Sequence, residues 1–252
     1  MFPLYDENPS VRLPLTTLAL IIGNGLVWLL LQQLGSSEGL ARSICQHGLI
    51  AGELLQRVPP GSSFALDAQF RCVLDGSGGW LTLFSSMFMH GGWMHLIGNM
   101  WFLWVFGDNV EDAMGHSRFL LFYLLCGLAA AAAQIATNPA STVPMVGASG
   151  AIGGVMGAYA RLYPRARIQM LVILGFYVTR VAVPALFMLG YWLLLQLLGA
   201  LPALGRLGGG VAFWAHIGGF AAGVVLAGPL TRADYLQQHL RQPPRRGARY
   251  RF

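Results

Sequence analysis

Residues 118–137 read RFLLFYLLCGLAAAAAQIAT, and the single charged residue in this stretch is Arg118, at its first position. A helix rises about 1.5 Å per residue, so about 20 such residues cross the roughly 30 Å hydrocarbon core of a bilayer. Comparable apolar stretches recur along the chain, at about residues 15–34, 93–107, 149–163, 181–201 and 211–230. The pattern predicts an all-α polytopic membrane protein, a bundle of about six transmembrane helices.

The composition agrees with a lipid environment. Hydrophobic residues make up 55% of the 252 residues and charged residues only 10%, against about 25% in an average soluble domain. We therefore expect one membrane domain over residues 1–230, with a long outer loop at about 35–92, and an Arg-rich cytoplasmic tail over 231–252. All 16 basic residues are arginines that lie outside the hydrophobic cores of the apolar runs, which indicates a topology signal and no nucleic-acid partner.

Two of the predicted spans, 93–107 and 149–163, are short, at about 15 residues or some 22 Å of helix. Short spans imply a locally thinned bilayer or helix ends that water can reach. A further apolar stretch, Ile168 to Val178, is interpreted as the start of an early fifth span. The first run, 15–34, lacks the basic segment and the cleavage site of a signal peptide, so we expect it to remain as a span.

The arginines predict an orientation. Counted between spans, four lie on the side of the long loop: Arg42, Arg57, Arg71 and Arg206. Twelve lie on the opposite side: Arg12, Arg118, Arg161, Arg165, Arg167, Arg180, Arg232, Arg241, Arg245, Arg246, Arg249 and Arg251. The positive-inside rule therefore places both termini in the cytoplasm. The polar tail is expected to be a disordered segment near anionic lipid.

The long outer loop contains Cys45 and Cys72. An oxidising compartment would permit a disulfide between them, and two independent thiols are the alternative. Cys126 falls inside the third span, where a small packing residue is the expected role.

Four polar residues inside the spans invite functional hypotheses, because polar groups in lipid are costly: His95, Asn99, Ser149 and His216. They lie in the first turn or two of the second, fourth and sixth spans. Alternate spans of a bundle begin on the same side of the membrane, so these four residues share one level. This inference depends only on counting crossings and holds for either orientation.

Ser149 lies in the sequence Gly147-Ala148-Ser149-Gly150, where a loop turns into the fourth helix. The free N–H groups and positive dipole end of that helix would favour an oxyanion there. The alternative is a small packing residue among glycines, which is the usual role of such a serine in a membrane helix.

His216 begins a stripe of small residues on the sixth span, continued by Gly219 and Gly223. A similar stripe on the fourth span is formed by Ser149, Gly153 and Gly157. Two such stripes let helices approach closely, which would bring the imidazole within hydrogen-bond reach of the hydroxyl. A hydrogen-bonded core histidine is the alternative.

His95 and Asn99 are four residues apart and share one face of the second span. Both side chains can donate hydrogen bonds, so together they could stabilise a tetrahedral oxyanion, or they could tie a loop to the helix. His90, in the preceding loop, is expected to be structural.

The positions of the carboxylates exclude other enzyme classes. All ten aspartates and glutamates fall outside the predicted spans, and no HExxH motif is present. An intramembrane aspartyl protease or a zinc protease is therefore not predicted, and proton-coupled transport is disfavoured. No metal or cofactor is expected, and a serine enzyme here would use a Ser-His dyad without an acidic partner.

Four segments between residues 80 and 228 carry the polar residues in small-residue and aromatic surroundings: MFMHGGWMHLIGNM (87–100), FGDNVED (106–112), GASGA (147–151) and AHIGG (215–219). In sequence and in order, these segments resemble the motifs of the rhomboid intramembrane serine proteases, in their bacterial form. The resemblance implies a six-helix core and hydrolysis of peptide bonds in or near the transmembrane segments of single-span proteins. It also implies a multi-pass protein of the bacterial inner membrane whose active site faces the extracytoplasmic side.

Residue by residue, the resemblance implies that Ser149 is the nucleophile and that His216 transfers the proton. Asn99, His95 and the Ser149 backbone N–H would form the oxyanion hole. Helix five and the loop before helix six act as a gate in the family, and that loop here carries Gly208-Gly209-Gly210.

Two positions depart from the family pattern. Gly153 stands where many relatives carry an aromatic residue that stacks on the catalytic histidine; Phe213, Trp214 and Tyr159 are candidates to replace it. Trp80 is followed by Leu81, whereas relatives often carry a Trp-Arg pair in the first outer loop. Two other functions stay open: a non-catalytic protein of the same fold that binds client helices, and a transporter or channel.

Overall fold

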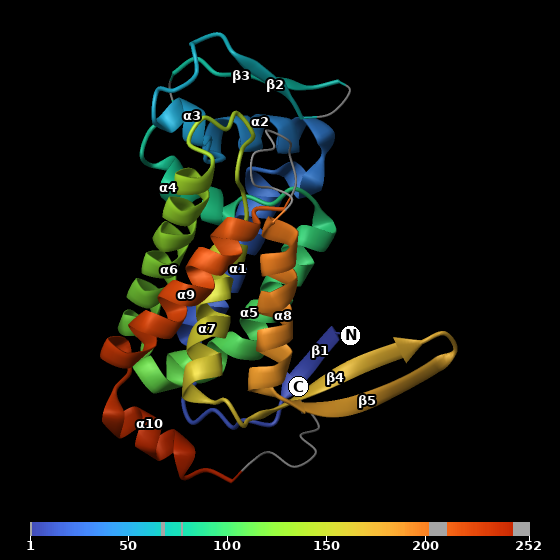
Figure 1. The fold of residues 1–252 in the computed structure, drawn as a ribbon, viewed down its shortest axis with the longest axis vertical. Coiled ribbons are helices and arrows are strands. Elements are labelled where there is room, and N and C mark those ends of the chain that lie inside the picture. The colour runs from blue at the N-terminus through green and yellow to red at the C-terminus, as the bar shows by residue number, and fades with distance from the viewer. Residues whose placement is uncertain (1, 67–68, 77, 202–210, 244–252) are drawn as a thin grey trace.

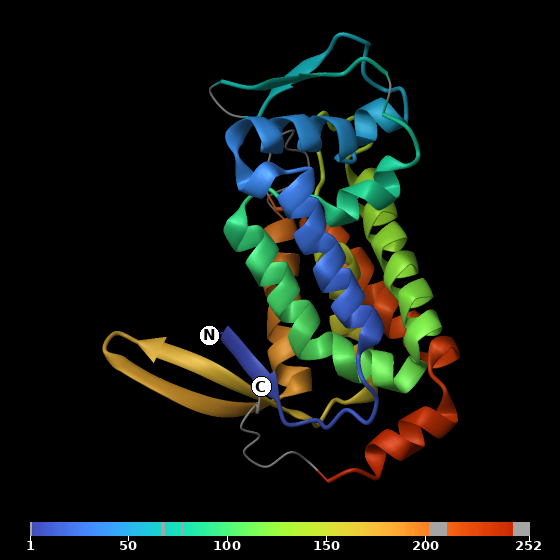
Figure 2. The same ribbon diagram turned by 180° about the vertical axis from the view of Figure 1, so that it is seen from behind.

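The computed structural model describes residues 2–66, 69–76, 78–201 and 211–243. Its longer helices stand side by side in an upright bundle (Figures 1 and 2): α1 (Leu15–Leu30), α5 (Trp93–Met114), α6 (His116–Thr137), α7 (Ser149–Leu162), α8 (Ala185–Ala200) and α9 (Phe213–Leu230). Among the described helices, α6 and α9 are long and apolar enough to cross a membrane, and α1 and α8 are shorter apolar helices. Two of the predicted spans are thus matched, and the full count stays a prediction.

A cap closes one end of the bundle, at the top of Figure 1. It is built from five short elements: α2 (Ser37–His47), α3 (Ala51–Leu54), β2 (Ser63–Ala65), β3 (Arg71–Val73) and α4 (Thr82–Ser85). Short 3-10 turns, Gln33–Gly35 and Ser86–Phe88, join the cap to the helices below. The long outer loop predicted at about 35–92 is therefore an ordered layer over this end of the bundle in its described part.

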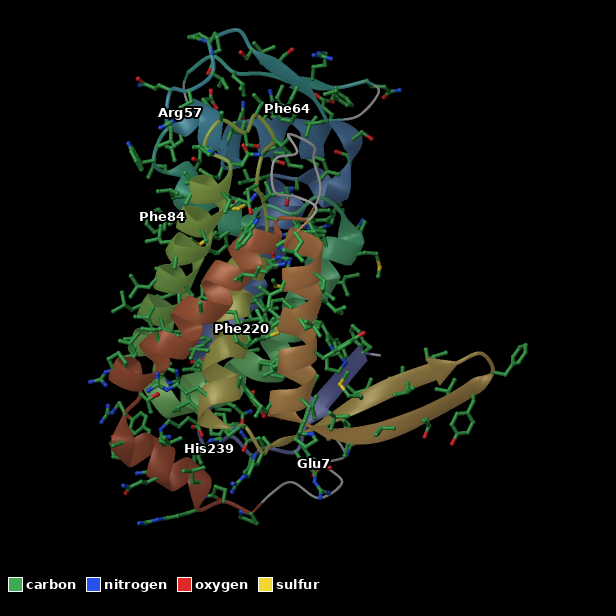
Figure 3. The ribbon with its side chains drawn as sticks, in the orientation of Figure 1. Glu7, Arg57, Phe64, Phe84, Phe220 and His239 are labelled. Atoms are coloured by element: carbon green, nitrogen blue, oxygen red, sulfur yellow. A yellow bond between two sulfur atoms is a disulfide. The ribbon has the colours of Figure 1, made fainter. Side chains whose placement is uncertain are left out.

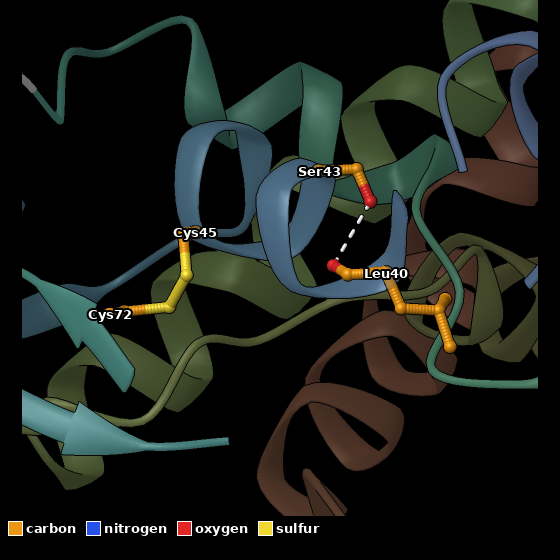
Figure 4. Close-up of a disulfide and its surroundings, with 4 residues drawn as sticks. All are labelled: Leu40, Ser43, Cys45 and Cys72. Atoms are coloured by element: carbon orange, nitrogen blue, oxygen red, sulfur yellow. Dashed lines mark hydrogen bonds between the residues drawn. A yellow bond between two sulfur atoms is a disulfide. The ribbon is translucent and has the colours of Figure 1, made fainter. Parts of the chain in front are cut away.

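A disulfide between Cys45 and Cys72 ties α2 to β3 within the cap (Figure 4). The bond settles the alternative left open by the sequence. Nearby, the Ser43 hydroxyl donates to the Leu40 carbonyl at 3.2 Å inside α2. Cys126 is the free cysteine, buried inside α6 as expected for a packing residue.

The apolar segment Ile168 to Val178 is not the start of a span. It forms the hairpin of β4 (Arg167–Leu174) and β5 (Tyr177–Pro184), and β1 (Phe2–Asp6) pairs antiparallel with β4. Gly175, at φ +60, supplies the left-handed backbone that a two-residue hairpin turn requires. The three-stranded sheet projects sideways from the end of the bundle opposite the cap (Figure 1). An apolar run of this length fits a strand as well as a helix, and pairing with the distant β1 decides for the strand.

The second predicted span was placed too short. Helix α5 has 22 residues and ends at Met114, where Gly115, with φ +78, caps it. Three of the ten carboxylates that we assigned to loops therefore lie on its last turns: Asp108, Glu111 and Asp112.

Glu111 and Asp112 are tolerated because other segments of the chain donate hydrogen bonds to them. Glu111 accepts from the backbone N–H groups of Thr16 and Thr17, both at 2.8 Å, at the start of α1. Asp112 accepts from the Arg12 backbone at 2.9 Å and from His239 Nδ1 at 2.7 Å. The last turns of α5 thus bind the N-terminal segment, α1 and α10 on the side of the bundle opposite the cap.

The prediction of a disordered tail is wrong for the first part of that segment. Residues Ala233–Leu240 form α10, which packs His239 against the bundle end, as labelled in Figure 3. Buried contacts with Asp112 and with the ring of Tyr163, whose centroid is 4.6 Å from that of His239, hold the helix in place. Residues 244–252 lie outside the described part of the chain.

Helix α7 occupies the middle of the bundle, and every residue from Gly150 to Ala160 is buried. Its contact with α9 is the most extensive between any two of the described elements. A Cβ placed on Gly219 would overlap the Gly150 carbonyl oxygen, and one on Gly223 would overlap that of Gly154. The two helices are therefore in backbone contact, which only glycine permits at these positions.

Gly219→Ala should lower the free energy of unfolding by about 3 kcal/mol, because the new methyl group must push two backbones apart. Gly25→Ala is the matched control, since a Cβ there has no atom within 4 Å on the exposed face of α1. Thermal unfolding in detergent compares the two proteins. Equal midpoints for Gly219→Ala and Gly25→Ala would show that α7 and α9 are not in backbone contact.

Candidate active site

Ser149 and His216 meet at the cap-side end of the α7–α9 contact. Ser149 is the first residue of α7, and His216 lies in the first turn of α9. The distance between Ser149 Oγ and His216 Nε2 is 2.8 Å, a hydrogen bond between two residues 67 positions apart in the chain. The glycine contacts farther along both helices bring the two backbones close enough for this bond.

The loop before α7 is fixed by backbone bonds. Met145 pairs with Leu49 in the cap, and the Gly147 N–H donates to the Ser86 carbonyl at 2.9 Å. Gly147 has φ +125, a conformation that favours glycine and turns the chain sharply into the helix. At the helix start no side chain caps the backbone, so the first N–H groups of α7 remain available to an anion.

The second ring nitrogen of His216 contacts helix α8. Gln196 Oε1 lies 2.8 Å from His216 Nδ1, and the Trp192 ring lies 5.8 Å from the imidazole, centroid to centroid, at a tilt of 39°. Neither residue was predicted from the sequence. The available signal was that Gln196 is the one amide side chain in the stretch 181–201.

The aromatic neighbour of His216 is therefore Trp192, which was not among the three candidates named from the sequence. Tyr159 contacts Phe106 and Tyr163 instead, farther along α7. The departure at Gly153 also has a steric reason. A Cβ there would lie 3.0 Å from the His216 carbonyl oxygen and 3.7 Å from the Trp192 ring, so this side of the imidazole is already occupied.

His95 and Asn99 lie one turn apart on α5, on the same face of the helix. The Gly91 N–H donates to His95 Nδ1 at 3.2 Å, so the ring proton is on Nε2. A Cβ on Gly147 would lie 2.7 Å from His95 Nε2 and 3.5 Å from Ser149 Oγ, which places both groups beside one point. The Nδ2 group of Asn99 is buried and has no hydrogen-bond partner among the described residues. Both side chains can therefore still donate a hydrogen bond.

A small cavity lies beside Ser149. Its wall is formed largely by small or apolar residues, among them Met87, Gly127, Ala130, Gly150 and Ala215. A short apolar side chain fits such a space better than a charged one. Among the described residues, no group of three or more metal-ligating side chains is found.

His90 is buried beside His95, and the amide of Gln32 forms two hydrogen bonds with its backbone. Gln32 Nε2 donates to the His90 carbonyl at 2.7 Å, and the His90 N–H donates to Gln32 Oε1 at 2.9 Å. The His90 ring packs edge-on against His95, with centroids 5.1 Å apart. Burial, aided by neighbouring His95, lowers the pKa of His90 from 6.5 to about 3. These contacts fit the structural role that we expected for it.

Because His90 stays neutral in the folded protein, its contribution to stability is full above pH 6.5 and is lost as the pH falls from 6.5 toward 3. Between pH 7.5 and 5, the wild type should lose about 2 kcal/mol more stability than His90→Phe, which cannot be protonated. Denaturant unfolding at both values measures this difference. If the two proteins lose stability equally, His90 is protonated in the folded state.

Comparisons with known proteins identify the family of the chain. A family model described as the Rhomboid domain matches residues 77–233. The chain is 40% identical over 85 residues to Rhomboid protease GluP of Bacillus subtilis, covering 34% of this chain and 16% of that protein. It is 32% identical over 96 residues to mitochondrial Rhomboid protein 1 of Saccharomyces cerevisiae, covering 36% and 28%. It is 37% identical over 76 residues to chloroplastic Rhomboid-like protein 11 of Arabidopsis thaliana, covering 30% and 27%.

The aligned stretches span less than a third of each of these relatives. The family match, however, covers more than half of the chain and includes α5, α7 and α9, which carry the four candidate residues. The fold is mostly helical, and the match implies an integral membrane protein. The chain therefore belongs to the rhomboid family.

Proposed function

We propose that this protein is an intramembrane serine endopeptidase, with Ser149 as nucleophile and His216 as general base. The observation that carries the proposal is the 2.8 Å hydrogen bond between Ser149 Oγ and His216 Nε2. A hydroxyl bonded to an imidazole at the start of a helix is the arrangement that activates a serine. The names of relatives such as Rhomboid protease GluP support the same activity.

The proposed reaction runs in two halves. Ser149 Oγ attacks the scissile carbonyl carbon while His216 Nε2 takes its proton, and the imidazolium then protonates the leaving amine. His216 next removes a proton from water, which hydrolyses the acyl-enzyme and restores the serine.

Three donors are proposed for the oxyanion: the Nε2–H of His95, the Nδ2–H of Asn99 and the backbone N–H of Ser149. The tautomer of His95 and the unpaired amide of Asn99 support this role. Donors placed in advance at the developing charge contribute much of the rate in acyl-transfer enzymes.

The proposed substrates are single-span membrane proteins, cut in or near their transmembrane segments next to a small side chain. The small residues that line the cavity beside Ser149 support the size preference. We further propose six spans over residues 1–230, both termini in the cytoplasm of a bacterium, and the active site toward the extracytoplasmic face. The excess of arginines away from the cap supports this orientation.

Ser149→Ala and His216→Ala should each reduce cleavage by more than about 1000-fold, because each removes one half of the proposed dyad. Cleavage of a single-span test protein in proteoliposomes measures this, with Ser43→Ala as the control, the same change at a serine of α2 outside the proposed site. A fluorophosphonate probe should label the wild type at Ser149 and not label His216→Ala. Unchanged cleavage by Ser149→Ala would refute the proposal, and binding of the test protein without cleavage would favour the client-binding alternative.

Asn99→Ala should slow cleavage by about 10- to 1000-fold through kcat, because one oxyanion donor is lost. The matched control is Asn109→Ala, the same change on the same helix, where Nδ2 donates to Asp108 at 2.7 Å instead. Steady-state kinetics of both variants give kcat and KM. Equal effects at the two positions would assign Asn99 a structural role.

A further inference from the structure

Gln196 stands out in α8 because its amide is held by its own helix. Its Nε2 group donates to the Trp192 carbonyl one turn earlier, at 3.4 Å. The opposite side of the amide, Oε1, lies 2.8 Å from His216 Nδ1. The carbonyl oxygen is therefore the atom presented to the imidazole, and it can only accept a hydrogen bond.

This contact selects one tautomer of His216. An acceptor at 2.8 Å requires a proton on Nδ1, since two lone pairs at that distance would repel each other. With the proton on Nδ1, the Nε2 lone pair points to Ser149 Oγ, also 2.8 Å away. The other tautomer would place a proton between Nε2 and the serine, and the imidazole could not accept the hydroxyl proton.

Trp192 holds the same ring from the side. It lies four residues before Gln196, so both side chains share one face of α8. Its ring also packs on Phe220 of α9, with centroids 6.1 Å apart and planes 29° from parallel. Helix α8 thus supplies both the acceptor that keeps the proton on His216 Nδ1 and the aromatic surface that holds the plane of the imidazole.

We propose that Gln196 is a positioning residue of the active site, acting through the hydrogen bond from His216 Nδ1–H to its Oε1. The proposal rests on the proposed function for its catalytic consequence. The same bond remains when His216 becomes an imidazolium during the reaction, so the amide oxygen also stabilises the transferred charge. Gln196 takes the place that an aspartate holds in a Ser-His-Asp triad, with a neutral oxygen in place of a charged one.

The test compares two substitutions of equal length. Gln196→Met fills the same space and removes the hydrogen-bond acceptor. Gln196→Glu keeps an acceptor oxygen at the same position. We expect Gln196→Met to lower kcat by about 10- to 100-fold with KM changed less than about twofold, and Gln196→Glu to stay within about threefold of the wild type. A smaller loss than in an aspartate triad is expected because the acceptor is uncharged.

A spectroscopic readout tests the same bond without relying on activity. In protein with 15N-labelled histidine, the wild type and Gln196→Glu should show His216 protonated at Nδ1, and Gln196→Met should show a mixture of both tautomers. His216→Ala identifies the signal. Gln134→Met is the matched control, since Gln134 Oε1 accepts from the Ala215 backbone at 3.3 Å and bonds the helix rather than the ring. It should keep the wild-type signal.

The outcomes separate this inference from the proposed function. A wild-type tautomer and wild-type kcat in Gln196→Met would overturn the inference, as would equal losses in Gln196→Met and Gln196→Glu. If instead the wild type and Ser149→Ala cleave alike, the proposed function fails, and the 15N signal alone decides whether Gln196 sets the tautomer.

Discussion

The close approach of α7 and α9 is the constraint on which the rest of the site depends. Helices packed through ordinary side chains keep their axes about 8–10 Å apart. Here the carbonyl groups of Gly150 and Gly154 rest directly on Gly219 and Gly223, with no room for a Cβ. This backbone contact lets a serine and a histidine on different helices share a hydrogen bond without long side chains.

The end of the molecule away from the cap is held by a different kind of force. The carboxylates of Glu111 and Asp112 are nearly fully buried, yet each accepts several hydrogen bonds from the N-terminal segment, α1 or α10. A buried carboxylate is stable only when it is bonded in this way. The buried carboxylates thus lie at one end, and the candidate site toward the other end is built from neutral groups.

Because the groups in the site are neutral, local hydrogen bonds decide which nitrogen of each imidazole carries the proton. A backbone N–H donates to Nδ1 of His95, which leaves Nε2 as a donor, and Gln196 accepts from Nδ1 of His216, which leaves Nε2 as an acceptor. The two imidazoles near Ser149 therefore have opposite tautomers, with the proton on Nε2 in His95 and on Nδ1 in His216. One can stabilise a negative oxygen and the other can take a proton, as acyl transfer requires.

Much of this site was predictable from sequence. Counting spans predicted one shared level for four residues, Ser149, His216, His95 and Asn99, and the long apolar stretches located α6 and α9 within two residues. What only the tertiary structure decided depends on partners far away in the chain. The segment Ile168–Val178 is a hairpin because β1 pairs with it, and α5 continues through its carboxylates because α1 and α10 bind them. Gln196 reaches His216 because α8 leans on α9, and no spacing within α8 alone reveals that contact.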